Sequence, residues 1–298
     1  MKKTIFALVF IAVGIGTFFL TKSLFNAGDA ENNQSAATTT PNNGSIVGAN
    51  DAKETAIGKS VEGRDIVAYH YGTGDKELLF VGGIHGGYEW NTVLVAYELM
   101  DYVTENPGAI PANVKITIIP VLNPDGLNKT LGTTTRFAQA DVPASEARQV
   151  AGRFNANTVD LNRNFDCDWQ ATGMWQTKQV SGGSAAFSEP ESAAIKNYVE
   201  TNKPRAVVTW YSSAGGVFAS SCHNGVLPET NTLTKKYADA SGYPSYQSFN
   251  FYEITGDMVN WLAKENIPAI SVLLTNHTDT EWTKNRKGIE ALLAYYAK

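Results

Sequence analysis

A histidine and a glutamate that follow an apolar stretch are the side chains of this sequence best suited to chemistry. Residues 78–81 (Leu-Leu-Phe-Val) have the pattern of a buried strand, and a glycine-rich loop then carries His85 and, four residues later, Glu89. Open α/β sheets build their sites where strands end. An imidazole and a carboxylate on a short loop are also two of the ligands that a catalytic zinc ion uses. The loop therefore predicts two zinc ligands.

Two arginines lie further along the chain in polar segments. Arg153 and Arg163 stand in stretches rich in asparagine, with few carboxylates nearby to pair them. Arginine can hold a carboxylate by two parallel hydrogen bonds, and it can stabilise an oxyanion as charge develops on a carbonyl. An isolated arginine is more commonly a solvated surface group. The segment 123–126 (Asn-Pro-Asp-Gly) by itself indicates only a turn.

Strands alternate with helices over the part of the chain that must position these side chains. This alternation predicts one α/β domain, residues 51–298, with a largely parallel sheet covered on both faces. A loop-rich insertion is expected at residues 127–179, and Ser188 is expected to cap the helix that follows it. The expected strands are 65–71, 77–82, 114–121, 205–211 and 269–275, and the expected helices are 89–104, 189–202, 231–241, 256–265 and 280–297.

The composition limits the classes of partner. The 298 residues are 43% hydrophobic and 18% charged, with a net charge of −5. Since the sequence has no basic cluster, nucleic acid is not an expected partner. The mean hydropathy of −0.21 excludes a polytopic membrane protein.

The N-terminus has the pattern of a targeting segment. Lys2 and Lys3 precede an apolar run at residues 5–20, which predicts a signal peptide or an N-terminal membrane anchor over residues 1–26. Residues 27–50 are rich in Asn, Ala, Thr and Ser, as in a disordered linker. We expect an exported protein, either secreted or attached to the outer face of the cytoplasmic membrane. Cys167 and Cys222 are then expected to pair as a disulfide.

Four segments in a fixed order give the chain a resemblance to a known family. They are the His/Glu loop after a strand, Asn-Pro-Asp-Gly, an arginine ahead of Asp-Leu-Asn-Arg-Asn-Phe (160–165), and a Tyr-(x)3-Gly-(x)4-Trp segment at 252–261. In this order they resemble the zinc metallocarboxypeptidases, peptidase family M14, over residues 57–293. The resemblance implies a mixed, mostly parallel eight-stranded sheet with helices on both faces.

The resemblance also implies roles for individual residues and one Zn²⁺ ion per chain. His85 and Glu89 would bind the zinc, and Arg153 would polarise the scissile carbonyl. The other implied roles concern the substrate: Asn162 and Arg163 would bind its terminal carboxylate, Tyr252 would close over it, Val259 would line an apolar side-chain pocket, and Asp257 is an alternative group that would receive an amino group.

The His/Glu loop is one residue longer than the family's His-x-x-Glu, which we interpret as a tolerated variation. Besides this loop, two positions depart from the family pattern. The third zinc ligand, a histidine in the family, aligns with Ser212, or with Tyr211 in a less favoured alignment, and the general base, a glutamate in the family, aligns with Leu273. A hydroxyl is not a usual zinc ligand, and leucine cannot accept a proton. The candidate substitutes are His223 and His277 as ligands and Glu281 or Glu253 as base, although a loop histidine more commonly bonds to backbone or solvent.

The resemblance therefore implies a hydrolase that acts on the free C-terminus of peptides through metal-activated water. Export makes peptidoglycan stem peptides one substrate class to consider. A pseudopeptidase that binds peptide C-termini without turnover is the first alternative, because both departures fall on catalytic positions. An acyl-amino-acid deacylase on a related fold is the second.

Overall fold

The computed structural model describes residues 53–298, which belong to one compact unit. The predicted signal peptide or anchor and the predicted linker lie outside the described residues. None of the described helices is both long enough and apolar enough to cross a membrane.

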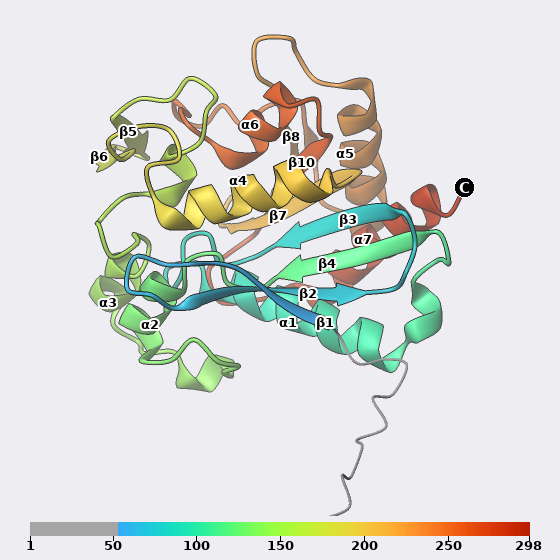
Figure 1. The fold of residues 1–298 in the computed structure, drawn as a ribbon, viewed down its shortest axis with the longest axis horizontal. Helices are drawn as coiled ribbons and strands as arrows, with labels where there is room; N and C mark the ends of the chain where they lie inside the picture. The colour runs from blue at the N-terminus through green and yellow to red at the C-terminus, as the bar shows by residue number, and fades with distance from the viewer. Residues whose placement is uncertain (1–52) are drawn as a thin grey trace, which may run out of the picture. The chain divides into compact units, whose positions relative to one another are not determined.

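A mixed sheet of eight strands forms the centre of the domain (Figure 1). Its order is β1-β2-β4-β3-β7-β10-β8-β9, and the pairs β4–β3, β3–β7, β7–β10 and β8–β9 are parallel. Strands β5 and β6 form a separate hairpin. The strand bounds are β1 Lys53–Lys59, β2 Asp65–Tyr71, β3 Lys76–Val81, β4 Val114–Ile119, β5 Thr172–Trp175, β6 Lys178–Ser181, β7 Ala206–Ser212, β8 Gly216–Ala219, β9 Ser245–Tyr246 and β10 Ala269–Leu274.

Helices cover both faces of the sheet, which confirms the fold expected from the sequence. Side chains of α1, α5 and α7 pack on one face, and those of α4 and α6 pack on the other; Figure 1 shows α4 in front of the sheet and α1 behind it. The helix bounds are α1 Trp90–Glu105, α2 Pro124–Leu131, α3 Glu146–Ala151, α4 Pro190–Asn202, α5 Pro228–Ser241, α6 Met258–Lys264 and α7 Trp282–Tyr296, with short 3-10 helices at Pro107–Ala109, Gln139–Asp141 and Leu161–Arg163.

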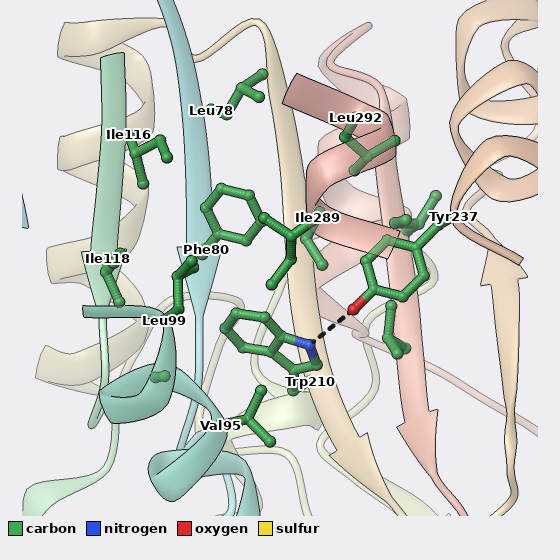
Figure 2. Close-up of a cluster of buried hydrophobic side chains, with 14 of the residues drawn as sticks. Leu78, Phe80, Val95, Leu99, Ile116, Ile118, Trp210, Tyr237, Ile289 and Leu292 are labelled. Atoms are coloured by element: carbon green, nitrogen blue, oxygen red, sulfur yellow. Dashed lines mark hydrogen bonds between the residues drawn. The ribbon is translucent and has the colours of Figure 1, made fainter. Parts of the chain in front are cut away.

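The central strands β3, β4, β7 and β10 are mostly apolar, as is typical of strands that are buried on both faces. On the α1 side, the rings of Phe80 and Trp210 stack with centroids 5.7 Å apart, and the Trp210 indole donates a 3.4 Å hydrogen bond to the Tyr237 hydroxyl (Figure 2). The alternate residues, Tyr211 and Leu273 among them, pack on the α4 and α6 side. This alternation decides which side chains of β7 and β10 belong to the same face.

Several short elements lie where the sequence indicated loops. The Asn-Pro-Asp-Gly segment opens α2, and the Asn123 side chain caps it by accepting a hydrogen bond from the Gly126 amide. The insertion at 127–179 contains α3 and the β5–β6 hairpin. The predicted cap of α4 was wrong: Glu189 occupies the N-cap position, and the Ser188 hydroxyl bonds to the Glu189 carboxylate instead.

Candidate functional site

The loop between β3 and α1 brings Glu89 against His85. Gly86 has a positive φ of 43°, and a Cβ atom there would lie 2.7 Å from the Gly152 carbonyl oxygen. The Gly87 amide donates a 3.0 Å hydrogen bond to the same oxygen. Because both positions lack a side chain, the loop packs flat against the segment that leads to Arg153. The two glycines thus accommodate the four-residue spacing, and His85 Nδ1 lies 3.0 Å from Glu89 Oε1.

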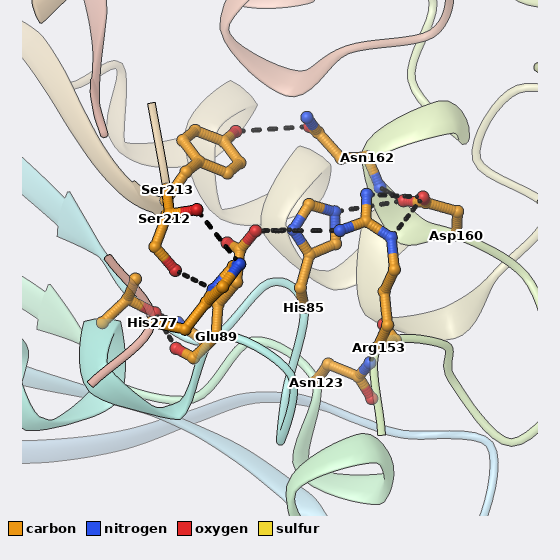
Figure 3. Close-up of polar contacts among 12 residues, drawn as sticks. His85, Glu89, Asn123, Arg153, Asp160, Asn162, Ser212, Ser213 and His277 are labelled. Carbon is orange, nitrogen blue, oxygen red and sulfur yellow. Dashed lines mark hydrogen bonds and ion pairs between the residues drawn. The ribbon is translucent and has the colours of Figure 1, made fainter. Parts of the chain in front are cut away.

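A buried network joins this pair to Asp160 and Arg153 (Figure 3). His85 Nε2 lies 3.1 Å from Asp160 Oδ1, while Nε and Nη2 of Arg153 donate to Asp160 Oδ2 at 3.0 and 2.8 Å. Nη1 of Arg153 is 3.7 Å from Glu89 Oε1. All four side chains are at most 3% exposed. Two carboxylates therefore face one guanidinium and one imidazole in a mostly buried network at the wall of a cleft.

The charges in this network shift its pKa values in opposite directions. Burial by itself would raise the pKa of Asp160, but the Arg153 charge and then His85 hold that pKa well below its ordinary value. For His85, burial and Arg153 lower the pKa, whereas the Glu89 and Asp160 carboxylates raise it and prevail. The network therefore favours the ionised form of the Asp160 carboxylate.

Two atoms in the network have the properties expected of metal ligands. His85 Nδ1 and Glu89 Oε2 are buried and have no hydrogen-bond partner among the described residues. The contact between Nδ1 and Oε1 is short, but its geometry is not that of a hydrogen bond. Asp160 holds the opposite ring nitrogen, as a carboxylate does behind many metal-binding histidines. These residues fit the first two ligands of a zinc ion.

The third ligand position holds Tyr211 rather than Ser212. The Tyr211 ring lies 5.9 Å from the His85 ring, and its hydroxyl donates a 3.2 Å hydrogen bond to Asn162 Oδ1. Ser212 points to the other side of the strand, where its hydroxyl meets His277. Strand residues alternate between faces, so the structure favours the alternative alignment, in which Tyr211 takes the position of the third ligand. Burial, with Asp257 and Glu89 nearby, raises the pKa of Tyr211 well above 10, so its phenol remains a neutral group.

The base position is apolar. Leu273 of β10 lies opposite Tyr211 in the parallel register with β7 and lines the same cleft, as does Val259 of α6. Neither side chain can move a proton. The two departures from the family pattern are thus neighbours in space.

The substitutes suggested by the sequence do not complete the site. His223 is exposed and pairs with Asp168 at 3.1 Å, beside the disulfide that joins Cys167 to Cys222. With both sulfurs oxidised, that cluster offers no thiolate to a metal. Glu281 receives hydrogen bonds from Tyr243, Thr275 and Lys284 and is not among the residues that line the cleft.

His277 does line the cleft, but both of its ring nitrogens face serine hydroxyls. Burial lowers the pKa of His277, so the neutral ring is favoured. Glu253 lines the cleft as an exposed residue. Of the four candidate substitutes, His277 and Glu253 thus line the cleft, whereas His223 and Glu281 do not.

The group predicted to bind a carboxylate lies in the same cleft, whose volume is about 630 Å³. Three of the five N–H groups of Arg163 donate to the carbonyl oxygens of Met174 and Asn162, which leaves two without a partner among the described residues. The Tyr252 ring lies 5.9 Å from the Arg163 guanidinium. Arg163 is thus held in place by its neighbours and retains two cationic N–H groups.

Asp257 serves the structure of this wall rather than an amino group. One of its carboxylate oxygens caps α6 by accepting from the Asn260 amide, and the other accepts from the Asn162 side chain at 2.8 Å. Burial raises the pKa of Asp257. Both oxygens of Asp257 thus already accept hydrogen bonds from the protein, and the role of Asp257 in receiving an amino group stays a prediction.

The sequence only weakly indicated that some residues belong to the site. Asp160 opens the Asp-Leu-Asn-Arg-Asn-Phe segment, so its position was known but its contacts to His85 and Arg153 were not. The guanidinium of Arg153 lies 4.4 Å from the Trp175 ring and 5.6 Å from the Tyr88 ring. Trp175 belongs to the insertion, where no pattern indicated an approach to the site.

Comparisons with known proteins give the family. The profile described as zinc carboxypeptidase, peptidase family M14, matches residues 50–290. The chain belongs to this family.

Among curated proteins, the chain is 25% identical over 226 residues to the gamma-D-glutamyl-L-diamino acid endopeptidase 1 of Lysinibacillus sphaericus, covering 66% of this chain and 54% of that protein. It is 28% identical over 196 residues to the human carboxypeptidase N catalytic chain, covering 61% and 40%. The chain thus spans about half the length of these relatives or less.

Solved structures of the family share the fold. Bovine thrombin-activatable fibrinolysis inhibitor, in complex with tick carboxypeptidase inhibitor, matches with a TM-score of 0.65 and 18% identity over 83% of this chain and 88% of that one. The murein-tripeptide amidase of Escherichia coli O157 matches with a TM-score of 0.57 and 19% identity over 82% and 91%. The chain therefore has the fold of these solved structures.

Proposed function

We propose that this zinc carboxypeptidase-family chain recognises the free C-terminus of a peptide, and that its metal-dependent hydrolysis is impaired. One observation carries the proposal. Arg163 has two N–H groups that can bind a carboxylate, whereas the part of the same cleft next to His85 and Glu89 is lined by the Tyr211 phenol and the Leu273 side chain. Recognition needs the N–H groups of Arg163. Hydrolysis by metal-activated water needs a third zinc ligand and a general base, which Tyr211 and Leu273 do not provide.

Charge and rigidity favour a carboxylate as the group that is bound. Arg163 is 1% exposed, and its cation has no carboxylate partner among the described residues. A buried cation without a counterion is costly, so a ligand carboxylate would relieve that cost as well as add hydrogen bonds. Arg153 differs, because Asp160 already holds it. The terminal carboxylate of a peptide therefore belongs at Arg163, with Tyr252 beside it.

Zinc is the family's cofactor, and two of its ligands are present here. His85 and Glu89 are the residues that would hold the ion, and bound zinc supplies a Lewis acid that polarises a carbonyl. Two protein ligands bind the ion less firmly than the usual three. Turnover as a carboxypeptidase, the activity that the family resemblance first suggested, is thus the weaker proposal, and an acyl-amino-acid deacylase lacks a specific observation in its favour.

Peptides of the cell wall are the substrate class that we propose. The relatives include a gamma-D-glutamyl-L-diamino acid endopeptidase, and a murein-tripeptide amidase shares the fold. The lysine-flanked apolar N-terminus predicts export, to the medium or to the outer face of the cytoplasmic membrane, where such peptides occur.

Arg163→Lys should weaken the binding of a peptide with a free C-terminus by about 10- to 100-fold. Lysine keeps the charge but loses the planar pair of N–H groups, and a hydrogen bond to a charged group contributes about 1.5–3 kcal/mol. Fluorescence anisotropy with a labelled stem-type peptide measures the effect. Arg205→Lys is the matched control, because Arg205 is an exposed residue that pairs with Glu229 on the surface. Equal affinities in both variants would contradict the assignment of Arg163.

A further inference from the structure

Two serine hydroxyls and one imidazole lie in a row beside the cleft, apart from the carboxylate-binding residues. Ser212 Oγ is 2.7 Å from His277 Nδ1, and Ser213 Oγ is 3.2 Å from His277 Nε2 (Figure 3). Ser213 is exposed, and both Ser213 and His277 line the cleft. The Tyr88 ring packs on the imidazole with centroids 4.6 Å apart. An imidazole that is held on both sides thus faces an accessible hydroxyl.

The directions of the hydrogen bonds between Ser212, His277 and Ser213 follow from Asn91, a buried residue next to Ser212. The side-chain nitrogen of Asn91 donates to the carbonyl oxygens of Asn276 and Asp279 at 2.8 and 3.0 Å. Its Oδ1 therefore faces Ser212, 3.2 Å away, and needs a donor because Asn91 is fully buried. Ser212 has one hydroxyl hydrogen and gives it to Asn91. The Ser212 oxygen must then accept from His277 Nδ1–H.

This assignment fixes the tautomer of the imidazole. With its proton on Nδ1, neutral His277 presents the Nε2 lone pair to the Ser213 hydroxyl, which becomes the donor of that contact. A hydroxyl that donates to an imidazole, whose other nitrogen is held by a third group, is the arrangement of an activated nucleophile. Here Ser212 and Asn91 take the orienting place that a carboxylate takes in a Ser-His-Asp triad.

We propose that Ser213 and His277 form a nucleophile–base pair that takes an acyl group from an ester or amide in the cleft without a metal ion. Ser213 Oγ attacks the carbonyl carbon while its proton passes to His277 Nε2. The bond from the carbonyl carbon to the leaving oxygen or nitrogen then breaks, and that atom takes the proton from His277. Water hydrolyses the acyl-serine by the same steps, with Ser213 as the leaving group.

The proposed pair is independent of the peptide-binding function proposed above. It uses neither His85 and Glu89 nor Arg163, and Arg153 is the other arginine that lines the same cleft. Ser212 and Asn91 are neutral, so they stabilise an imidazolium less than a carboxylate does. The reaction is therefore slow, and a covalent adduct is a better readout than turnover.

The test is covalent labelling of the chelator-treated protein with a fluorophosphonate. Ser213 Oγ displaces fluoride from phosphorus, and the hydroxyl proton leaves through His277. Peptide mass spectrometry should find the adduct on Ser213 and none on Ser248, an exposed serine that lines the same cleft without a histidine partner. His277→Gln should slow adduct formation at least about 100-fold, which is the lower range of a general base's contribution.

Three results would overturn the proposal. They are labelling of Ser213 no faster than labelling of Ser248, an equal labelling rate in His277→Gln, and loss of the adduct when zinc is removed. Because Ser213 is exposed, Ser213→Ala should fold normally, and it should bind the peptide as the wild type does while forming no adduct at all. A failure of the pair is thus distinguishable from a failure of C-terminus recognition.

Ser212 is a positioning residue, and its role has a separate readout. Nitrogen NMR of the imidazole should show His277 with its proton on Nδ1 in the wild type. Ser212→Ala removes the acceptor of that proton and should give a mixture of both tautomers together with slower labelling of Ser213. An unchanged Nδ1–H tautomer in Ser212→Ala would show that Ser212 and Asn91 do not orient the ring.

Discussion

Tyr211→His combined with Leu273→Glu should raise zinc-dependent release of a peptide's C-terminal residue by at least about 100-fold. The histidine adds the third ligand beside His85 and Glu89, and the glutamate adds the base, whose contribution is typically about 10²–10⁴-fold. Both positions lie on the same face of adjacent strands and line the cleft. Mass spectrometry of the peptide, with zinc and with a chelator, measures the release.

Two matched variants separate the causes of such a gain. Tyr211→His with Leu273→Gln keeps the new ligand and the side-chain size but lacks the base, so it should retain zinc without the gain in rate. Ser212→His with Leu273→Glu places the histidine on the other face of β7 and should gain nothing. A wild-type protein that already releases the residue as fast as the first double variant would show that hydrolysis is not impaired.

Asp160→Asn should lower the free energy of unfolding by about 3–5 kcal/mol, the usual cost of removing one partner from a buried ion pair. The carboxylate of Asp160 is fully buried and holds Arg153 through two hydrogen bonds and His85 through a third. Asparagine keeps the shape but removes the charge of the carboxylate nearest to the guanidinium, which leaves only Glu89 at 3.7 Å. Urea denaturation measures the loss. Asp65→Asn is the control, because the exposed Lys59–Asp65 pair should contribute only about 0–1 kcal/mol.

The stability lost in Asp160→Asn should depend on pH in a definite direction. Because the folded state holds the pKa of Asp160 well below its ordinary value, the ionised carboxylate stabilises the fold above the unfolded pKa of about 3.9. This stabilisation decreases as the pH falls below that value and is lost as the pH passes the folded pKa. The difference between wild type and Asp160→Asn should therefore shrink in acid. A difference that stayed constant from pH 7 to pH 3 would contradict a contribution from the ionised carboxylate of Asp160.

The sequence was most informative where hydrophobic pattern and family motif agree. Strand 78–81 and the helix after Glu89 follow from an apolar run and a helical period, and the central sheet follows from their alternation. The motif Asp-Leu-Asn-Arg-Asn-Phe located Asn162 and Arg163 but not the role of Asp160, because a contact to His85 across 75 residues leaves no local pattern.

The sequence was least informative where a shift of one residue along a strand moves a side chain to the opposite face of the sheet. Tyr211 and Ser212 are neighbours in the chain, yet one lies beside His85 and the other beside His277. Only the pairing of β7 with β10 distinguishes them. The Ser213–His277 contact had no motif either, because 64 residues separate its partners. The short β8 and β9 strands and the β5–β6 hairpin were missed because two to four residues are too few to show a period.

The most direct test of the proposed function is a calorimetric titration of the wild-type protein with two peptides. One peptide has a free C-terminal carboxylate, and the other is the same sequence as its C-terminal amide. We predict that the free acid binds at least about 10-fold more tightly than the amide, since the amide offers no charge to Arg163. The peptide recovered after incubation with zinc should be intact. Equal affinity for acid and amide would contradict recognition of the C-terminus, and complete loss of the terminal residue would contradict the impaired hydrolysis.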